Sequence, residues 1–275
     1  MTEATLLALG SAALHAAWNL LIKTSNERFL AAWGQFVFGG LLFLPVLLVI
    51  GLPGTAVVPF LVASSCVHVV YIGALVRAYH HGDFSFAYPL ARGGGALLAA
   101  IGGVLFLSDT LSGGEWLGIL VVALGLMSFV RPGVTTVALA WAGLTAVTIG
   151  TYTTIDIEGA RRSTGLAYGI CLMLGAATAI SLAGVAIGRG PAFVRSLRGA
   201  WGRYALGGAL TTVAYSMVLA AGRLAPTGYV AALRESSVVF GALAGWLLLH
   251  ERLGRARLYS SMIVAAGLVT LVVFR

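Results

Sequence analysis

The chain has 275 residues, of which 59% are hydrophobic and 9% are charged, and its mean hydropathy is +0.97. Soluble domains carry about 25% charged residues, so this composition excludes a soluble enzyme, a nucleic-acid-binding module and a disordered protein. The net charge of +8 is better explained by basic loops at anionic lipid surfaces than by nucleic acid as a partner.

Apolar runs of membrane-spanning length follow one another along the whole chain. Because backbone polar groups in lipid must be satisfied within their own segment, each run is expected to be a helix. The start of the fourth helix is marked by Asp83, that of the fifth by the capping-box pair Ser112 and Glu115, and that of the ninth by Pro226. The ten expected helices lie at 4–23, 30–51, 56–79, 84–107, 113–130, 135–157, 165–188, 202–222, 227–250 and 256–274.

An internal repeat divides the chain into two halves, 1–131 and 132–275. With an offset of 142 positions, residues 73–128 align with 215–270 without a gap, and about one residue in five is identical. Arg92 falls on Arg234, and Asp109 falls on Glu251. A stripe of small residues also recurs, at Gly95, Ala99 and Gly103 and at Ser237, Gly241 and Gly245, and is expected to let the fourth and ninth helices approach closely. Five helices per repeat would insert the second half inverted relative to the first, as in many secondary transporters.

Several short segments resemble the EamA family of the drug/metabolite transporter superfamily. They are 15–19 (HAAWN), 88–93 (YPLARG), 108–111 (SDTL), 232–235 (ALRE) and 250–253 (HERL). The resemblance implies two inverted five-helix repeats in the bacterial cytoplasmic (inner) membrane, with the fifth and tenth helices outside a central cavity. The chain departs from one bacterial branch of the family in having Ala96 where that branch has a proline.

Two arginines, Arg92 and Arg234, are expected near the middle of the membrane. Each costs about 2.5–3.5 kcal/mol there, so each should face a cavity or a partner. We expect them to bind an anionic group of a substrate; the alternative is a structural ion pair with Glu235 or Asp156. Arg234 and Glu235 are adjacent and would point about 100° apart on a helix, so this pair is not expected to meet face to face.

The same two carboxylates are the candidates for proton coupling. A buried carboxyl group can hold a proton, which favours Glu235 as a carrier; the alternative is a permanent salt bridge. Asp156 could bind protons or simply lie at the membrane interface. Asp109 and Glu251, at helix ends, are interpreted as structural.

Aromatic and amide side chains are expected to line the site, where ring faces and polar edges orient a ligand. Packing within the bundle is the alternative for each aromatic residue. No spaced set of metal ligands, nucleophile–base set or cofactor motif is present, so neither a metal, a cofactor nor an enzyme is expected. The candidates are Trp18, Asn19, Tyr71, Tyr88, Tyr152 and Tyr215.

Loop charges predict an orientation, because Lys and Arg favour the cytoplasmic side. The odd-numbered connections are far more basic than the even-numbered ones, which places both termini outside, whereas the family resemblance implies termini inside. The connection between the seventh and eighth helices is expected to bind anionic lipid through Arg189, Arg195, Arg198 and Arg203.

The sequence therefore predicts a permease that moves a small polar, anionic or zwitterionic metabolite by alternating access around a midplane site. Its partners would be the substrate, membrane lipids and coupling protons, and the protein would be a monomer or a homodimer. One alternative is a proton-coupled exporter of cationic or aromatic compounds. Another is a membrane scaffold or lipid-headgroup handler that transports nothing.

Overall fold

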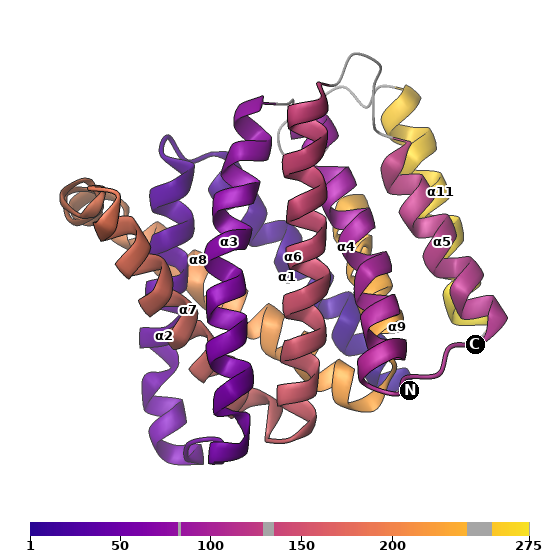
Figure 1. Ribbon diagram of the computed structural model, residues 1–275, viewed down its shortest axis with the longest axis horizontal. Coiled ribbons are helices and arrows are strands. Elements are labelled where there is room, and N and C mark those ends of the chain that lie inside the picture. The colour runs from indigo at the N-terminus through magenta and orange to yellow at the C-terminus, as the bar shows by residue number, and fades with distance from the viewer. Residues whose placement is uncertain (82–83, 129–134, 241–254, 275) are drawn as a thin grey trace.

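The computed structural model describes residues 1–81, 84–128, 135–240 and 255–274, and within these it contains helices and no strand (Figure 1). Each of the ten predicted spans contains an α-helix in this described part. The helices are α1 (Thr2–Lys23), α2 (Arg28–Ile50), α3 (Val58–His81, after the 3-10 turn Thr55–Val57), α4 (Phe84–Phe106), α5 (Gly113–Met127), α6 (Thr136–Arg161), α7 (Gly165–Ala186), α8 (Gly190–Leu224), α9 (Thr227–Arg234) and α11 (Arg255–Val273).

The distribution of apolar and polar residues is that of a multi-pass membrane protein. Within the described residues, six helices are long and apolar enough to cross a membrane: α1, α2, α3, α4, α7 and α8. Large apolar side chains lie exposed on the outside of the bundle, for example Leu48 and Leu182. Charged side chains such as Asp156 are buried inside it. Since lipid solvates apolar surface and not charge, this arrangement suits a bilayer.

The helix α6 is central and positions much of the candidate site. It packs against α3, α4, α7 and α8, and it buries Asp156 and four of its threonines, Thr145, Thr148, Thr153 and Thr154. These polar residues explain why α6, although 26 residues long, is not among the six strongly apolar helices. A polar helix is tolerated in a membrane when its polar side chains are buried by its neighbours.

Helices α5 and α11 lie side by side at one edge of the bundle (Figure 1). Their contact is close because glycines face backbone atoms across it. A Cβ at Gly118 would lie 2.7 Å from the Cα of Leu271, and a Cβ at Gly267 would lie 2.7 Å from the backbone nitrogen of Val122. Small residues allow such backbone approach between membrane helices.

Two predicted helix boundaries were wrong. The helix α8 begins at Gly190 rather than 202, with a proline in its first turn, and Phe193 of this extension stacks on Trp33 with ring centroids 4.1 Å apart. The extension was missed because its arginines interrupt the apolar pattern. In the ninth span, α9 ends at Arg234 and Glu235 lies in a turn before residues 236–240 continue as helix, so 227–250 is not one uninterrupted helix.

Two predicted start signals can be compared with the structure. The predicted capping box is confirmed, because Ser112 accepts a hydrogen bond from the Glu115 backbone while the Glu115 side chain accepts one from the Ser112 backbone. Pro226 immediately precedes α9. Asp83 lies outside the described residues.

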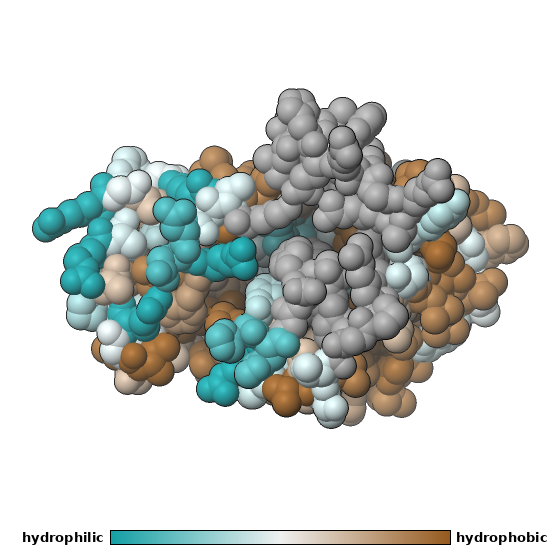
Figure 2. Space-filling model, turned by 90° about the horizontal axis from the view of Figure 1, so that it is seen from above, coloured by the Kyte–Doolittle hydropathy of each residue, from teal (hydrophilic) through white to brown (hydrophobic). Residues whose placement is uncertain are grey.

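Hydrophilic residues gather on the left side of the bundle end shown in Figure 2, and hydrophobic residues form its right side.

The arginine cluster that was predicted to bind anionic lipid, between the seventh and eighth predicted helices, is only partly free for lipid. Arg195 and Arg198 are exposed, but Arg189 pairs with Glu27 at 2.8 Å. Arg203 donates to the carbonyl of Leu21 at the end of α1, so this partly buried arginine is engaged within the protein. The free carbonyls of a helix end are a good acceptor for such a cation.

The first small-residue stripe does bring α4 close to another helix, but not along its whole length. Ala96 and Ala99 pack with Ala231 of α9, whereas Gly95 faces Ile149 of α6. The prediction that Gly95 serves contact with the ninth span was therefore wrong. Gly241 and Gly245, the counterparts of Ala99 and Gly103 in the second half, lie outside the described residues.

Candidate functional site

Arg92 and Glu235 form a buried two-point ion pair between α4 and the turn that follows α9. The Nε of Arg92 donates to Oε2 of Glu235 at 3.1 Å, and Nη2 lies 2.7 Å from Oε1. The two residues are 6% and 3% exposed. The alternative proposed from the sequence, that Arg92 forms an ion pair with Glu235, therefore describes this arginine correctly.

The local structure around Glu235 explains why it reaches α4. Its backbone nitrogen donates to Ala232 at 3.0 Å, and the nitrogen of Val238 donates back to the carbonyl of Glu235 at 3.0 Å. These three-residue spacings replace the four-residue spacing of an α-helix and tighten the chain at this point. Glu235 pairs with Arg92 and not with its neighbour Arg234, as the adjacency argument predicted.

Arg234 is buried without a carboxylate partner. It is 6% exposed, and its Nε has no hydrogen-bond partner among the residues that the structure describes. Across the same part of the chain, no ion pair includes its guanidinium. The guanidinium carbon instead lies 5.5 Å from the ring centroid of Tyr215, a cation–π contact with α8.

Asp156 lies in the last two turns of α6 and is held by two tyrosines. Its Oδ2 accepts a hydrogen bond of 2.6 Å from the Tyr215 hydroxyl, and its Oδ1 accepts one of 3.1 Å from Tyr168. Asp156 is fully buried by the protein, five residues before the end of α6 at Arg161. Tyr215 thus links this carboxylate to Arg234, with its hydroxyl on the first and its ring against the second.

An aromatic row extends from this cluster across the bundle. The ring of Tyr152, on α6, lies 6.4 Å from Tyr215, 5.5 Å from Tyr71 and 4.4 Å from His68. The imidazole Nδ1 of His68 lies 2.8 Å from the carbonyl of Ser64 in the preceding turn. Helices α3, α6 and α8 therefore contribute one continuous aromatic wall.

The remaining predicted residues come from α1 and α4. Trp18 contacts His15 edge-on, with ring centroids 4.6 Å apart. Asn19 donates its side-chain amide to the carbonyl of His15 at 2.9 Å, so this amide is engaged within its own helix. Tyr88 belongs to α4, but its side chain lies outside the described residues.

Tyr168 was missed by the sequence analysis. It lies on α7, twelve residues after Asp156 and across a short turn from it. The signal that could have found it is Gly159: the Tyr168 ring occupies the space that a side chain at this position would fill. A glycine one turn beyond a buried acid thus marks where a ring from the neighbouring helix enters.

Asp109 has a structural role, as its position at a helix end predicted. Its Oδ2 accepts a hydrogen bond from the backbone of Thr227, the first residue of α9, at 2.7 Å, and its Oδ1 lies 2.7 Å from Nη2 of Arg161. Arg161 also donates to the carbonyl of Gly222 at 2.9 Å. One ion pair therefore ties together the ends of α4, α6 and α8 and the start of α9. Glu251, its counterpart, lies outside the described residues.

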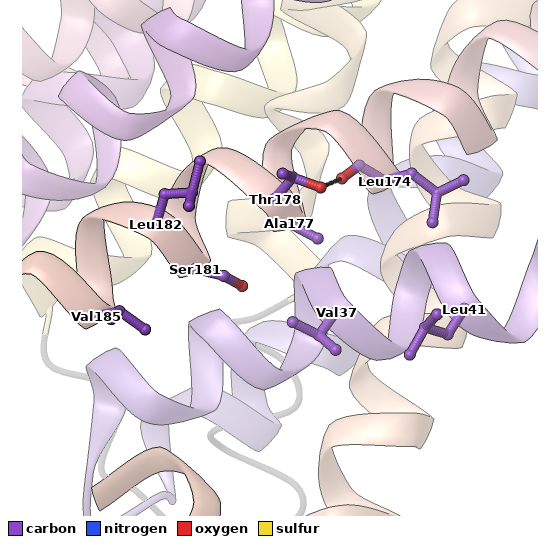
Figure 3. A pocket seen from close by; sticks show the side chains of 8 residues that line it. All are labelled: Val37, Leu41, Leu174, Ala177, Thr178, Ser181, Leu182 and Val185. Atoms are coloured by element: carbon purple, nitrogen blue, oxygen red, sulfur yellow. Dashed lines mark hydrogen bonds between the residues drawn. The ribbon is translucent and has the colours of Figure 1, made fainter. Parts of the chain in front are cut away.

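A separate groove of about 380 Å³ lies between α2 and α7 (Figure 3). It contains no residue of the candidate site, and its lining includes the exposed side chains Leu41, Leu182 and Val185. Because it opens on the apolar outside of the bundle, acyl chains of the bilayer would fill it. Within the described residues there is also no cluster of three or more side chains that could hold a metal ion.

Comparisons with known proteins define the fold and not the ligand. No family model and no curated protein matches the chain. Among solved structures 29 chains match, and one, described as "Crystal structure of protein", aligns with 99% of this chain and 98% of its own at a TM-score of 0.75 and 16% identity. The chain therefore shares its whole fold with a solved protein, at an identity too low to transfer a function.

Proposed function

We propose that the chain is a secondary transporter of the EamA type, built as two inverted five-helix repeats, which moves a small metabolite with an anionic group across the bacterial cytoplasmic membrane. The repeat in the sequence supports the architecture. The helix order and the pair α5 and α11 at one edge of the bundle also support it. Alternating access would come from the two halves rocking around the buried charges.

The observation that carries the proposal is the guanidinium of Arg234, buried on the ring of Tyr215 without a carboxylate in the described structure. An unpaired charge inside a membrane protein is costly and marks a ligand or ion path. An anionic ligand would supply the missing partner and can bind the planar guanidinium through two hydrogen bonds. The aromatic row beside Arg234 would shape the rest of the cavity.

Two alternatives fit the charges less well. A cationic substrate would need a free acid, but Glu235 is engaged by Arg92 and Asp156 accepts hydrogen bonds from two tyrosines. A scaffold would have no use for an arginine that lacks a carboxylate partner among the described residues. A lipid-headgroup handler could use it, and the counterflow assay below separates that alternative from a transporter. Proton coupling through Glu235 or Asp156 stays part of the proposal, as a property that transport assays at different pH gradients would reveal.

We expect an anionic or zwitterionic ligand to stabilise the purified protein against heat, and Arg234→Ala to lose this effect. Butyrate, 4-aminobutyrate and putrescine carry the three charge types on one four-carbon chain. Saturating ligand at 100 times its Kd adds about 2.7 kcal/mol of stability. Loss of a charged hydrogen-bond partner should weaken binding at least about tenfold.

The matched control is Arg198→Ala, which removes an exposed arginine and should leave binding unchanged. Counterflow in proteoliposomes then separates a transporter from a scaffold, because only a transporter exchanges labelled ligand saturably. Stabilisation by putrescine alone, unaffected by Arg234→Ala, would refute the anion site and favour the exporter of cationic compounds.

A further inference from the structure

The two matched arginines of the repeats have different partners. Arg92 and Arg234 align in the sequence, and a symmetric site with two free guanidinium groups would suit a ligand with two anionic groups. In the structure, however, Glu235 neutralises Arg92 with a two-point contact, and Arg234 has no such partner among the described residues. Among the described residues, the site therefore has one arginine that is paired with a carboxylate and one that is not.

The repeat explains where this asymmetry originates. The 142-residue offset that aligns the arginines also aligns Glu235 with Gly93. The first half therefore has no carboxylate at the position that the second half uses. A Cβ at Gly93 would face α5, 3.0 Å from the Cβ of Leu126 and 3.2 Å from the carbonyl of Ala123. Packing against α5 would therefore crowd a side chain at this position, and Arg234 receives no internal partner from it.

Glu235 binds Arg92 in the way that a ligand carboxylate would. Both of its oxygens contact the guanidinium, at 3.1 and 2.7 Å, in an environment closed to solvent. Two-point contacts of this kind give an arginine its selectivity for carboxylates. On this side of the guanidinium, a substrate carboxylate would have to compete with one that is covalently part of the chain and already in place.

We propose that Glu235 is a specificity-determining residue, a built-in carboxylate that occupies Arg92 and restricts the site to substrates with a single anionic group. This inference rests on the proposed function, because it requires that Arg234 receives the anionic group of the substrate. It further predicts that removing the Glu235 carboxylate opens a second anion subsite at Arg92.

The test compares butyrate with succinate, which differ by one carboxylate on the same four-carbon chain. Ligand-dependent thermal stability is measured for wild type, Glu235→Gln, Glu235→Ser and the double variant Arg92→Met/Glu235→Gln. We expect wild type to bind butyrate more tightly than succinate. Either single variant should bind succinate at least about tenfold more tightly than wild type does, since a second charged contact forms. The double variant should lose this gain.

A merely structural role for Glu235 would weaken the protein without creating affinity for succinate. The inference is overturned if folded Glu235→Gln or Glu235→Ser gains no succinate binding, or if wild type itself binds succinate more tightly than butyrate. The comparison of succinate with butyrate in wild type tests the inference even where neither variant folds. Failure of the proposed function looks different: wild type then binds neither butyrate nor 4-aminobutyrate, or binds them independently of Arg234.

Discussion

Replacing Arg92 with alanine should lower the free energy of unfolding by about 3–5 kcal/mol, because it leaves Glu235 buried without its partner. The reason is an asymmetry of buried ion pairs. Forming such a pair contributes little net stability, since both charges lose their water, but removing one member leaves the other charge uncompensated. The Glu235 side chain is 4% exposed, so water cannot replace the lost guanidinium without rearrangement.

The double variant Arg92→Met/Glu235→Met should recover most of this loss, because it removes both charges and keeps apolar volume. Denaturation in one detergent, followed for both single variants and the double variant, measures the coupling between the residues. Arg162→Ala is the matched control: Arg162 contacts Glu158 at 2.6 Å, but its side chain is 52% exposed. That change should cost less than about 1 kcal/mol. A double variant no more stable than Arg92→Ala would show that the two charges are not coupled.

Replacing Gly118 with leucine should separate α5 from α11 and destabilise the protein by at least about 1–3 kcal/mol, the usual range for overpacking. A Cβ at this position would lie 2.7 Å from both the Cα and the backbone nitrogen of Leu271. Backbone atoms cannot move aside as the end of a flexible side chain can. The helices would therefore have to move apart and lose the contacts that small residues allow.

The control for this change is Gly143→Leu on α6. A Cβ at this position would have no heavy atom of a neighbouring segment within 4 Å. Unfolding midpoints of the two variants are compared with wild type in the same detergent. Because α5 and α11 lie at the edge of the bundle, Gly118→Leu should leave ligand-dependent stabilisation intact wherever the protein still folds (Figure 1). An unchanged midpoint in Gly118→Leu would contradict the close packing of these helices.

Much of the fold was predictable because membrane burial imposes a strong pattern on the sequence. Runs of apolar residues located the helices, and local signals such as the Ser112–Glu115 capping box located one helix start. The same cost of burying charge singled out the ionisable residues that the structure buries inside the bundle. Helix boundaries were mispredicted where a helix is not apolar or an apolar run is not one helix. The arginines at the start of α8 interrupt the apolar pattern although this segment is helical, and the turn at Glu235 has no clear sequence signal.

Which charges are buried can be predicted from their positions within apolar runs, but which of them pair depends on how the helices pack. Arg92 and Glu235 are 143 residues apart, and their contact depends on how α4 packs against α9 and on the tightened backbone at Glu235. The same holds for Tyr168, whose ring reaches Asp156 because Gly159 leaves room for it. Hydropathy follows from each residue's own transfer free energy and can be read along the chain. The direction of a side chain and the distance to its partner are set by helix packing, and no single segment encodes them.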